Sequence, residues 1–99
     1  METRFTWDPK KARRNLQVHG VAFKTAREVF SDPNHLTKEN YFIEDQGEQR
    51  YGMIGLTLKI LLLLVIFVDR SQGDLEIIHI ISARKADNYE RKAYEDQFH

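Results

Sequence analysis

Two apolar runs separated by a short polar turn dominate the hydrophobic pattern of the chain. Every residue of Ile60–Val68 is apolar, and a second, mainly apolar run, Leu75–Ile81, follows the polar turn Asp69–Asp74. Both runs have the length of a strand and are rich in Val, Ile and Leu, so together they predict a β-hairpin. The unbroken first run predicts a central strand with both faces buried. We therefore expect this hairpin to form the centre of the hydrophobic core.

Helix signals lie on both sides of the hairpin. The pair Asp8-Pro9 is a typical helix start, so the sequence predicts a helix over 9–19. A second helix is expected over Lys24–Phe30, and a third follows the capping residue Asp87 and runs to about Gln97. The residues expected on the buried faces of the three helices are Ala12, Leu16 and His19; Phe23, Ala26, Val29 and Phe30; and Ala93, Tyr94 and Phe98.

Shorter strands complete the predicted fold. Aromatic residues alternate in Arg4–Trp7, which predicts an edge strand, and the two glycines of Tyr51–Leu58 predict a bulge or a close backbone approach within a strand. The segment Asn34–Arg50 has mixed signals for one or two strands interrupted by loop. The element order is then β-α-α-β-β-β-α, an α+β fold with a mostly antiparallel sheet covered by helices. Without an internal repeat or linker, residues 1–99 are expected to form a single domain.

The charge of the chain is balanced overall but separated along its length. Residues 1–27 contain seven basic and two acidic residues, a net charge of +5, whereas residues 28–48 contain six acidic residues and one lysine, a net charge of −5. A polyanion could meet a local basic surface, although the whole-protein charge of zero would not attract it from a distance. The other interpretation is two solvated faces that partly pair with each other.

Composition excludes several classes of site. The chain has no cysteine, which excludes disulfides and thiolate metal sites. Its longest apolar run is nine residues, about half of what a membrane-spanning helix needs. The first residues lack the apolar segment of a secretion signal. We therefore expect a cytoplasmic protein without a cofactor.

Two arginines are candidates for binding a phosphate. Arg84 and Lys85 lie at the junction of the last strand and the last helix, where cations and helix N–H groups can meet an anion. Arg50 begins another strand and would lie beside Arg84 if those strands pair. The alternatives are that Arg84 pairs with a carboxylate and that Arg50 pairs with Glu48 at the surface.

Histidines and one tyrosine are the candidates for proton transfer. His79 lies within the second apolar run, so it is either a core residue or, if its strand face lines a cleft, a proton carrier near neutral pH. His19, at the end of the first helix, is a second candidate. Arg91 and Tyr94 are three residues apart on the last helix and could project past Arg84, although Tyr94 equally fits core packing.

Several short motifs, in this order along nearly the whole chain, resemble the BrnT family of toxins from bacterial type II toxin–antitoxin pairs. The motifs are Phe5-x-Trp7-Asp8-Pro9-x-Lys11, Asn15-Leu16-x-x-His19-Gly20-Val21-x-Phe23, Ala26-x-x-Val29-Phe30-x-Asp32-Pro33, Gly47-Glu48-x-Arg50, Ile54-Gly55 and Ile80-Ile81-Ser82-Ala83-Arg84-Lys85-Ala86 with Glu90-Arg91 and Tyr94. The resemblance implies a RelE-like ribonuclease fold, RNA cleavage that inhibits translation, and neutralisation by a BrnA-type antitoxin. That antitoxin would carry a DNA-binding domain, so DNA would be bound only through the complex. His79 stands where the family usually has a basic residue.

Metal-independent RNA cleavage is the chemistry that fits this resemblance. The 2′-hydroxyl of the substrate is the nucleophile, so the protein needs only a base, an acid and cations around the phosphorane. The candidate catalytic residues are Arg84 and Arg50 as a phosphate clamp, His79 or His19 as the proton carrier, and Tyr94 as an alternative; Lys85, Arg91 and Lys11 would bind flanking phosphates. Two other functions remain open: a catalytically weak or inactive module that binds a DNA-binding antitoxin, and a nucleic-acid binder without chemistry.

Overall fold

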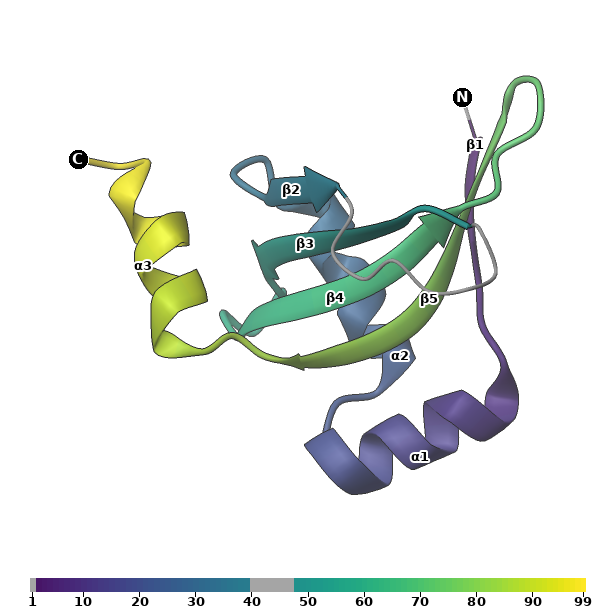
Figure 1. The fold of residues 1–99 in the computed structure, drawn as a ribbon, viewed down its shortest axis with the longest axis horizontal. Coiled ribbons are helices and arrows are strands. Elements are labelled where there is room, and N and C mark those ends of the chain that lie inside the picture. The colour runs from purple at the N-terminus through teal and green to yellow at the C-terminus, as the bar shows by residue number, and fades with distance from the viewer. Residues whose placement is uncertain (1, 40–47) are drawn as a thin grey trace.

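The predicted hairpin lies at the centre of a five-stranded sheet in the computed structural model, which describes residues 2–39 and 48–99 (Figure 1). In chain order the elements are β1 (Glu2–Thr6), α1 (Pro9–His19), α2 (Phe23–Ala26), the 3₁₀ helix η1 (Arg27–Ser31), β2 (Leu36–Glu39), β3 (Arg50–Leu56), β4 (Leu62–Asp69), β5 (Leu75–Lys85) and α3 (Asn88–Asp96). The strand order is β1-β5-β4-β3-β2, with β1 parallel to β5 and the other neighbours antiparallel. The predicted α+β class and mostly antiparallel sheet are confirmed.

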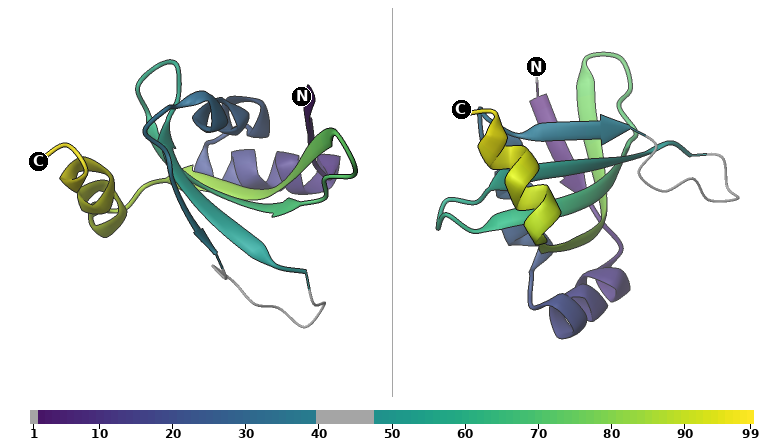
Figure 2. Two further views of the ribbon diagram at one scale, coloured as in Figure 1. Left: turned by 90° about the horizontal axis from the view of Figure 1, so that it is seen from above. Right: turned by 60° about the vertical axis from the view of Figure 1, so that its left-hand side comes forward.

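The central strand β4 is buried on both faces, as its unbroken apolar run predicts. All residues of Leu62–Val68 are at most 6% exposed. Val65 and Phe67 face α2 and η1 in the main core, and this side is called the helix-covered face below. Leu64 and Val68 lie on the opposite side, called the α3 face, where α3 lies at one end of the sheet (Figure 2).

One extra residue in β5 changes the direction of its side chains. Ser82 pairs with Ile66 but Ile80 pairs with Phe67, so Ile81 bulges out of the ladder. This extra residue lies beside α1.

Gly55 of β3 serves close packing, and the pairing of β3 with β4 has no bulge. A Cβ atom added to Gly55 would lie 3.0 Å from Cβ of Val29 and 3.1 Å from its carbonyl oxygen. The close-approach alternative for this strand is therefore confirmed, and it explains how η1 can pack directly against β3.

Helix α1 buries a polar residue where an apolar face was predicted. Its buried side chain is Asn15, whereas Leu16 is 51% exposed. The Asn15 amide donates to the carbonyls of Val21 and Ala83, both at 2.8 Å, and its oxygen accepts from the Ala83 N–H at 3.1 Å. Because β1 pairs with β5 only as far as His79, the free edge beyond that point needs hydrogen-bond partners, and Asn15 supplies them. The need to satisfy these backbone groups outweighs the gain from burying Leu16.

Three other predicted details are wrong: the continuity of the second helix, the burial of the first residues of the long apolar run, and the buried stripe of α3. The predicted helix Lys24–Phe30 is divided into α2 and η1, although its inward residues are confirmed as core or core-packed. Ile60 and Leu61, the first residues of the apolar run, lie exposed in the β3–β4 turn before β4 begins.

On α3, Tyr94 and Glu90 are buried, whereas Ala93 and Phe98 are exposed. The predicted capping box between Asp87 and Glu90 is confirmed. Part of the uncertain segment 34–50 forms β2, and the remainder of that prediction lies in 40–47, outside the described residues. No helix among the described residues is long and apolar enough to cross a membrane.

Candidate functional site

One row of paired residues brings His79 and Arg50 to the same face of the sheet. Thr6 pairs with His79, His79 with Val68, and Val68 with Arg50, so the row crosses β1, β5, β4 and β3. Residues directly opposite one another share a face, and two strand spacings separate the Cα atoms of His79 and Arg50 by roughly 10 Å. The Thr6 hydroxyl lies 2.7 Å from Nδ1 of the half-buried His79.

An ion pair occupies the next row on this face. The Arg70 N–H donates to the carbonyl of Ile77 at 2.8 Å, which continues the ladder one residue beyond β4. The Arg70 guanidinium donates two hydrogen bonds to the carboxylate of Glu48, at 2.9 and 3.1 Å. These bonds lower the pKa of Glu48, so this side chain is ionised at neutral pH.

The surroundings of His79 keep its imidazole neutral. Burial lowers its pKa, and the charges of Arg70 and Lys11 lower it further, against opposing effects of Glu48 and Asp8. Lys11, at the start of α1, is therefore within electrostatic range of His79. Five residues are connected by the strand register, by the ion pair or by these electrostatic effects, and are called the His79 cluster below: His79, Arg50, Arg70, Glu48 and Lys11.

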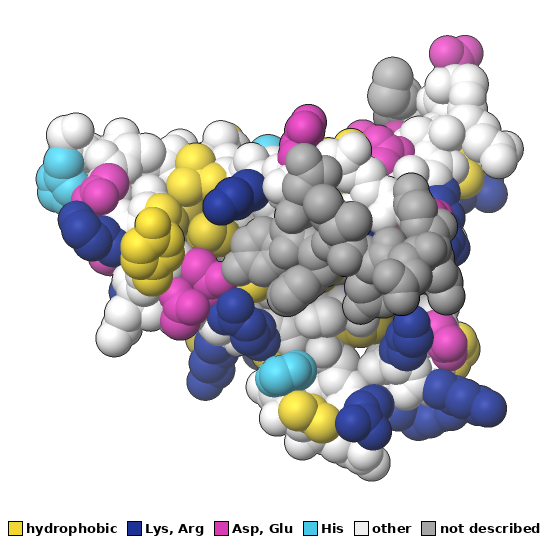
Figure 3. All heavy atoms as spheres, in the orientation of Figure 1, with side chains coloured by type: hydrophobic (Ala, Val, Ile, Leu, Met, Phe, Trp, Pro, Cys, Tyr) yellow, Lys and Arg dark blue, Asp and Glu magenta, His cyan; other side chains and the backbone are white. Residues whose placement is uncertain are grey.

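A basic groove leads from the His79 cluster along α1. Lys11 and Arg14 line it together with His19 at the end of the helix and the bulged Ile81 of β5, around a cavity of about 380 Å³. Figure 3 shows Lys and Arg side chains gathered over α1 along the lower edge of the molecule. Part of the basic charge that the sequence has in its first helix therefore lines this groove.

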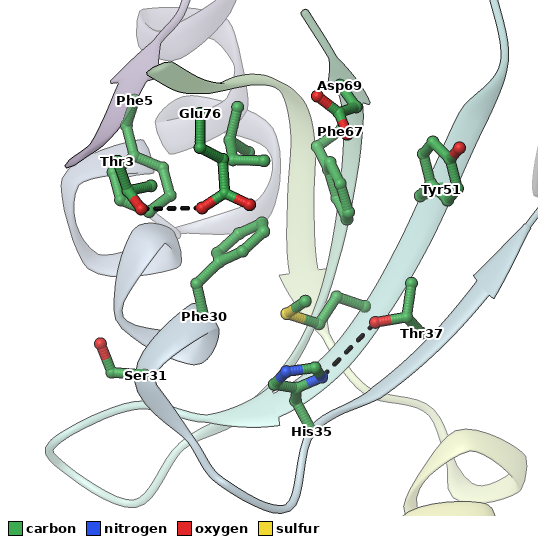
Figure 4. Close-up of a pocket in the computed structure, with 12 residues that line it drawn as sticks. Thr3, Phe5, Phe30, Ser31, His35, Thr37, Tyr51, Phe67, Asp69 and Glu76 are labelled. Atoms are coloured by element: carbon green, nitrogen blue, oxygen red, sulfur yellow. Dashed lines mark hydrogen bonds between the residues drawn. The ribbon is translucent and has the colours of Figure 1, made fainter. Parts of the chain in front are cut away.

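A second hollow has the opposite character. It lies on the helix-covered face, has a volume of about 450 Å³ and is walled by the aromatic rings of Phe5, Phe30 and Phe67 (Figure 4). Its polar rim includes the carboxylates of Asp69 and Glu76. Such a rim repels phosphate, so this hollow is poorly suited to a nucleic acid.

The structure does not bring Arg84 beside Arg50. The strands β3 and β5 do not pair, because β4 lies between them, and Arg84 pairs with Leu64 at the other end of β4. Leu64 is four residues from Val68, or about 13 Å along the strand. Arg84 donates two hydrogen bonds to the buried carboxylate of Glu90, at 2.8 and 2.9 Å. The alternative in which Arg84 pairs with a carboxylate is therefore confirmed.

Tyr94 is a buried anchor of α3. Its hydroxyl donates to the Asp32 carboxylate at 2.6 Å, and burial together with this bond raises the pKa of Tyr94 to about 12. Asp32 also accepts hydrogen bonds from the N–H groups of Leu56 and Asn34. A tyrosine with this pKa keeps its proton at neutral pH.

The other predicted residues lie apart from the His79 cluster. Lys85 pairs with Leu63 and so lies on the helix-covered face, and Arg91 is exposed on α3. Sequence reasoning did not select Arg70 or Arg14. Alternation along β4 assigns Arg70 to the same face as Val68, and this signal was available in the sequence; the pairing of Val68 with His79 was not. Among the described residues, no group of three His, Asp or Glu side chains could hold a metal ion.

A small α+β fold with an imidazole, a carboxylate and several cations on one sheet face has the groups that a nucleic-acid-cleaving protein requires. Residues 7–90 match the model of a family described as "Ribonuclease toxin, BrnT, of type II toxin-antitoxin system", and the chain therefore belongs to the BrnT family. The resemblance seen in the motifs is confirmed. The chain is accordingly a ribonuclease toxin of a type II system, with RNA as its substrate and an antitoxin that neutralises it.

A solved structure agrees in fold. The crystal structure of the Brucella abortus ribonuclease toxin BrnT matches 89% of this chain and 100% of its own, with 24% sequence identity and a TM-score of 0.56. Among curated proteins, no sequence matches this chain.

Proposed function

We propose that this toxin cleaves RNA at the His79 cluster, by attack of the substrate's own 2′-hydroxyl and without a metal ion. The observation that carries the proposal is the shared row of His79 and Arg50 on the α3 face, with Arg70 and Lys11 close enough to lower the pKa of His79. RNA already contains its nucleophile, so acid, base and cationic groups are sufficient for the reaction.

The neutral imidazole of His79 accepts the proton of the 2′-hydroxyl. The 2′-oxygen then attacks phosphorus, the bond from phosphorus to the 5′-oxygen breaks, and the departing 5′-oxygen takes a proton from the Lys11 ammonium. The products are a 2′,3′-cyclic phosphate and a 5′-hydroxyl. Arg50 and Arg70 stabilise the charge of the phosphorane, and Glu48 fixes the orientation of Arg70 through its two hydrogen bonds.

The groove along α1 binds the phosphates that flank the cleaved bond. Lys11, Arg14 and His19 line one side of it, and a histidine there can donate to a phosphate oxygen. His19 thus has a binding role and His79 the proton-transfer role. Arg84 and Tyr94 act through the position of α3, since each is bound to a carboxylate of the fold.

The antitoxin of this system is a BrnA-type protein with a DNA-binding domain, and DNA is bound only through the toxin–antitoxin complex. Free toxin inhibits translation because it destroys RNA. Membership of the BrnT family supports these assignments.

The proposal is tested by RNA cleavage with purified protein in excess EDTA. His79→Gln should lower the rate by about 10²–10⁴-fold, the usual contribution of general acid–base catalysis. Arg50→Ala should lower it by roughly 10²–10³-fold, the cost of one lost donor to the transition state. His19→Gln is the matched histidine control and should mainly raise KM.

The unfolding midpoint of each variant shows whether the fold is intact. Full activity of folded His79→Gln would remove this residue from the reaction. Wild-type protein that cleaves no RNA in EDTA would contradict metal-free chemistry and leave a binding module as the better description.

A further inference from the structure

The turn that joins β3 to β4 presents apolar side chains to solvent. Leu58 is 81% exposed and Ile60 is 76% exposed, and Leu61 beside them is also exposed. Figure 2 shows this turn projecting beyond the sheet next to the α2–η1 segment. A glycine, asparagine or charged residue is the usual choice for such a tip, because exposed apolar groups gain nothing from water.

Ile60 also has a backbone conformation that its side chain disfavours. Its φ angle is +63°, and it is the one residue other than glycine with a positive φ angle in the described part of the chain. A β-branched residue in the left-handed region is a genuine outlier. Such backbone strain clusters at functional sites, so a strained and exposed isoleucine points to a role for this turn.

A groove with a cationic rim adjoins the exposed turn. It has a volume of about 510 Å³ and runs between the turn, the start of α2 and the end of β5. Its cationic lining residues are Lys24, Arg27, Lys59 and Lys85, whereas Glu28 is the one carboxylate among its described lining residues. The Glu28 carboxylate accepts the N–H of Leu58 at 3.1 Å and so connects η1 to the turn.

We propose that this surface, formed by Leu58, Lys59, Ile60 and Leu61 with the rim of Lys24, Arg27 and Lys85, is a docking site for an acidic, amphipathic segment of the antitoxin. The leucine and isoleucine side chains bury against the apolar face of that segment, and the four cations face its carboxylates. RNA fits less well, since a phosphate backbone would leave the apolar tip without a partner. The inference depends on the family having an antitoxin, and not on the cleavage mechanism.

The site lies apart from the His79 cluster. Lys85 and Leu63 form a row near one end of β4, whereas His79 pairs with Val68 near the other end, and Lys85 is on the helix-covered face. The antitoxin segment would thus bind the toxin without contacting the proposed catalytic residues at this point.

Calorimetric titration of the purified toxin with its cognate antitoxin tests the proposal. Leu58→Asp and Lys59→Glu should each weaken binding by at least about tenfold, as expected for central contacts of an interface. Tyr89→Asp is the control for an exposed hydrophobic residue elsewhere, and Lys92→Glu is the control for an exposed lysine on α3. Both controls should bind as the wild type does.

Ile60→Gly gives the sharpest separation of binding from folding. Glycine adopts the observed φ angle freely, so the melting temperature should stay the same or rise, while antitoxin affinity falls. Ribonuclease activity without antitoxin should be unchanged in all three turn variants.

Wild-type antitoxin affinity in Leu58→Asp, Lys59→Glu and Ile60→Gly would overturn the inference. The inference would also be overturned if a turn variant kept its antitoxin affinity but lost RNA binding. It would likewise be overturned if the wild type formed a concentration-dependent dimer while the turn variants kept their antitoxin affinity. These results leave the assignment of the His79 cluster untouched, because that assignment is tested by cleavage alone.

Discussion

His79 is half-buried, and its pKa is lowered first by that burial and then by the charges of Arg70 and Lys11. An imidazole with a lowered pKa is neutral at neutral pH and can accept a proton there. Burial and the neighbouring cations therefore favour the neutral imidazole, which is the form that acts as a base. The same neighbours, Arg70 and Lys11, carry positive charge that attracts a phosphate.

We predict that the cleavage rate rises with pH through a pKa below the ordinary histidine value and is level near neutral pH. Arg70→Gln should move this acid limb to higher pH, because it removes a charge that opposes protonation of His79. Initial rates measured across pH in both proteins check this. An acid limb at the same pH in both would mean that another group titrates.

At the scale of elements, α3 depends on three polar contacts for its position, one of which is the hydrogen bond that the Gln97 side chain donates to the carbonyl of Asn34. Tyr94 binds Asp32, and Glu90 binds Arg84 and caps the helix. Few apolar contacts assist, because Phe98 and Tyr89 of this segment are mainly exposed. Loss of one polar contact should therefore affect α3 more than the sheet.

Tyr94→Phe should lower the free energy of unfolding at pH 7 by about 1.5–3 kcal/mol, the range for a hydrogen bond to a charged group. Burial raises the pKa of Asp32, but the bonds from Tyr94, Leu56 and Asn34 outweigh it and hold the value below the ordinary one. This stabilisation is complete above the pKa of the unfolded chain, about 4, and is lost as pH falls through the folded-state pKa.

Urea unfolding at pH 7 and pH 3 measures both effects of Tyr94→Phe. The difference from wild type should be smaller at pH 3. The exposed Tyr89→Phe is the matched control and should change neither value. An equal loss at both pH values would contradict a bond to an ionised Asp32.

Arg84→Ala should lower stability and leave the cleavage rate of the folded protein within a few-fold of wild type. It leaves the buried Glu90 carboxylate without its cationic partner, which we expect to cost about 1–3 kcal/mol because Arg84 itself is partly exposed. The exposed Arg91→Ala is the control for both measurements. A large loss of rate in folded Arg84→Ala would return this arginine to the catalytic site.

The sequence predicts well what local patterns determine. The unbroken apolar run identifies β4 because a strand with two buried faces needs no polar position, and the Asp87–Glu90 capping box identifies the start of α3. Strand pairing is not determined locally. The expected clamp between Arg50 and Arg84 requires β3 to pair with β5, whereas β4 lies between these strands.

Other differences between the sequence predictions and the structure also arise because strand pairing is not determined locally. The buried face of α1 is decided by the free edge of β5, to which the Asn15 amide bonds, and not by the spacing of apolar residues within the helix. His79 and Arg50 were selected because their residue types suit the chemistry. Their relation to Arg70 requires knowledge of the strand register.

At the scale of the whole molecule, a zero net charge is compatible with RNA binding because the charges are separated in space. The basic groove of α1 adjoins the His79 cluster, whereas the carboxylates of Asp69 and Glu76 lie at the hollow on the helix-covered face. A polyanion therefore meets one side of the protein in a preferred orientation.

This separation predicts a salt dependence that differs between two neighbouring arginines. Arg14 lines the groove beside Ile81, whereas Arg13 lies on another side of α1, near Trp7 and Leu16. Arg14→Ala should reduce the slope of log affinity for single-stranded RNA against log salt by about 0.7, the effect of one phosphate contact. Arg13→Ala should leave the slope unchanged. Equal slopes in the two variants would argue against the groove as the RNA path.

The most direct test of cleavage by the 2′-hydroxyl is the chemistry of the new RNA ends. Products formed by the wild-type toxin in excess EDTA should carry 2′,3′-cyclic phosphate and 5′-hydroxyl ends, identified by mass spectrometry, and His79→Gln should form few of them. Products with 3′-hydroxyl and 5′-phosphate ends would show that water, and not the 2′-hydroxyl, attacks phosphorus, and would contradict the role assigned to the His79 cluster.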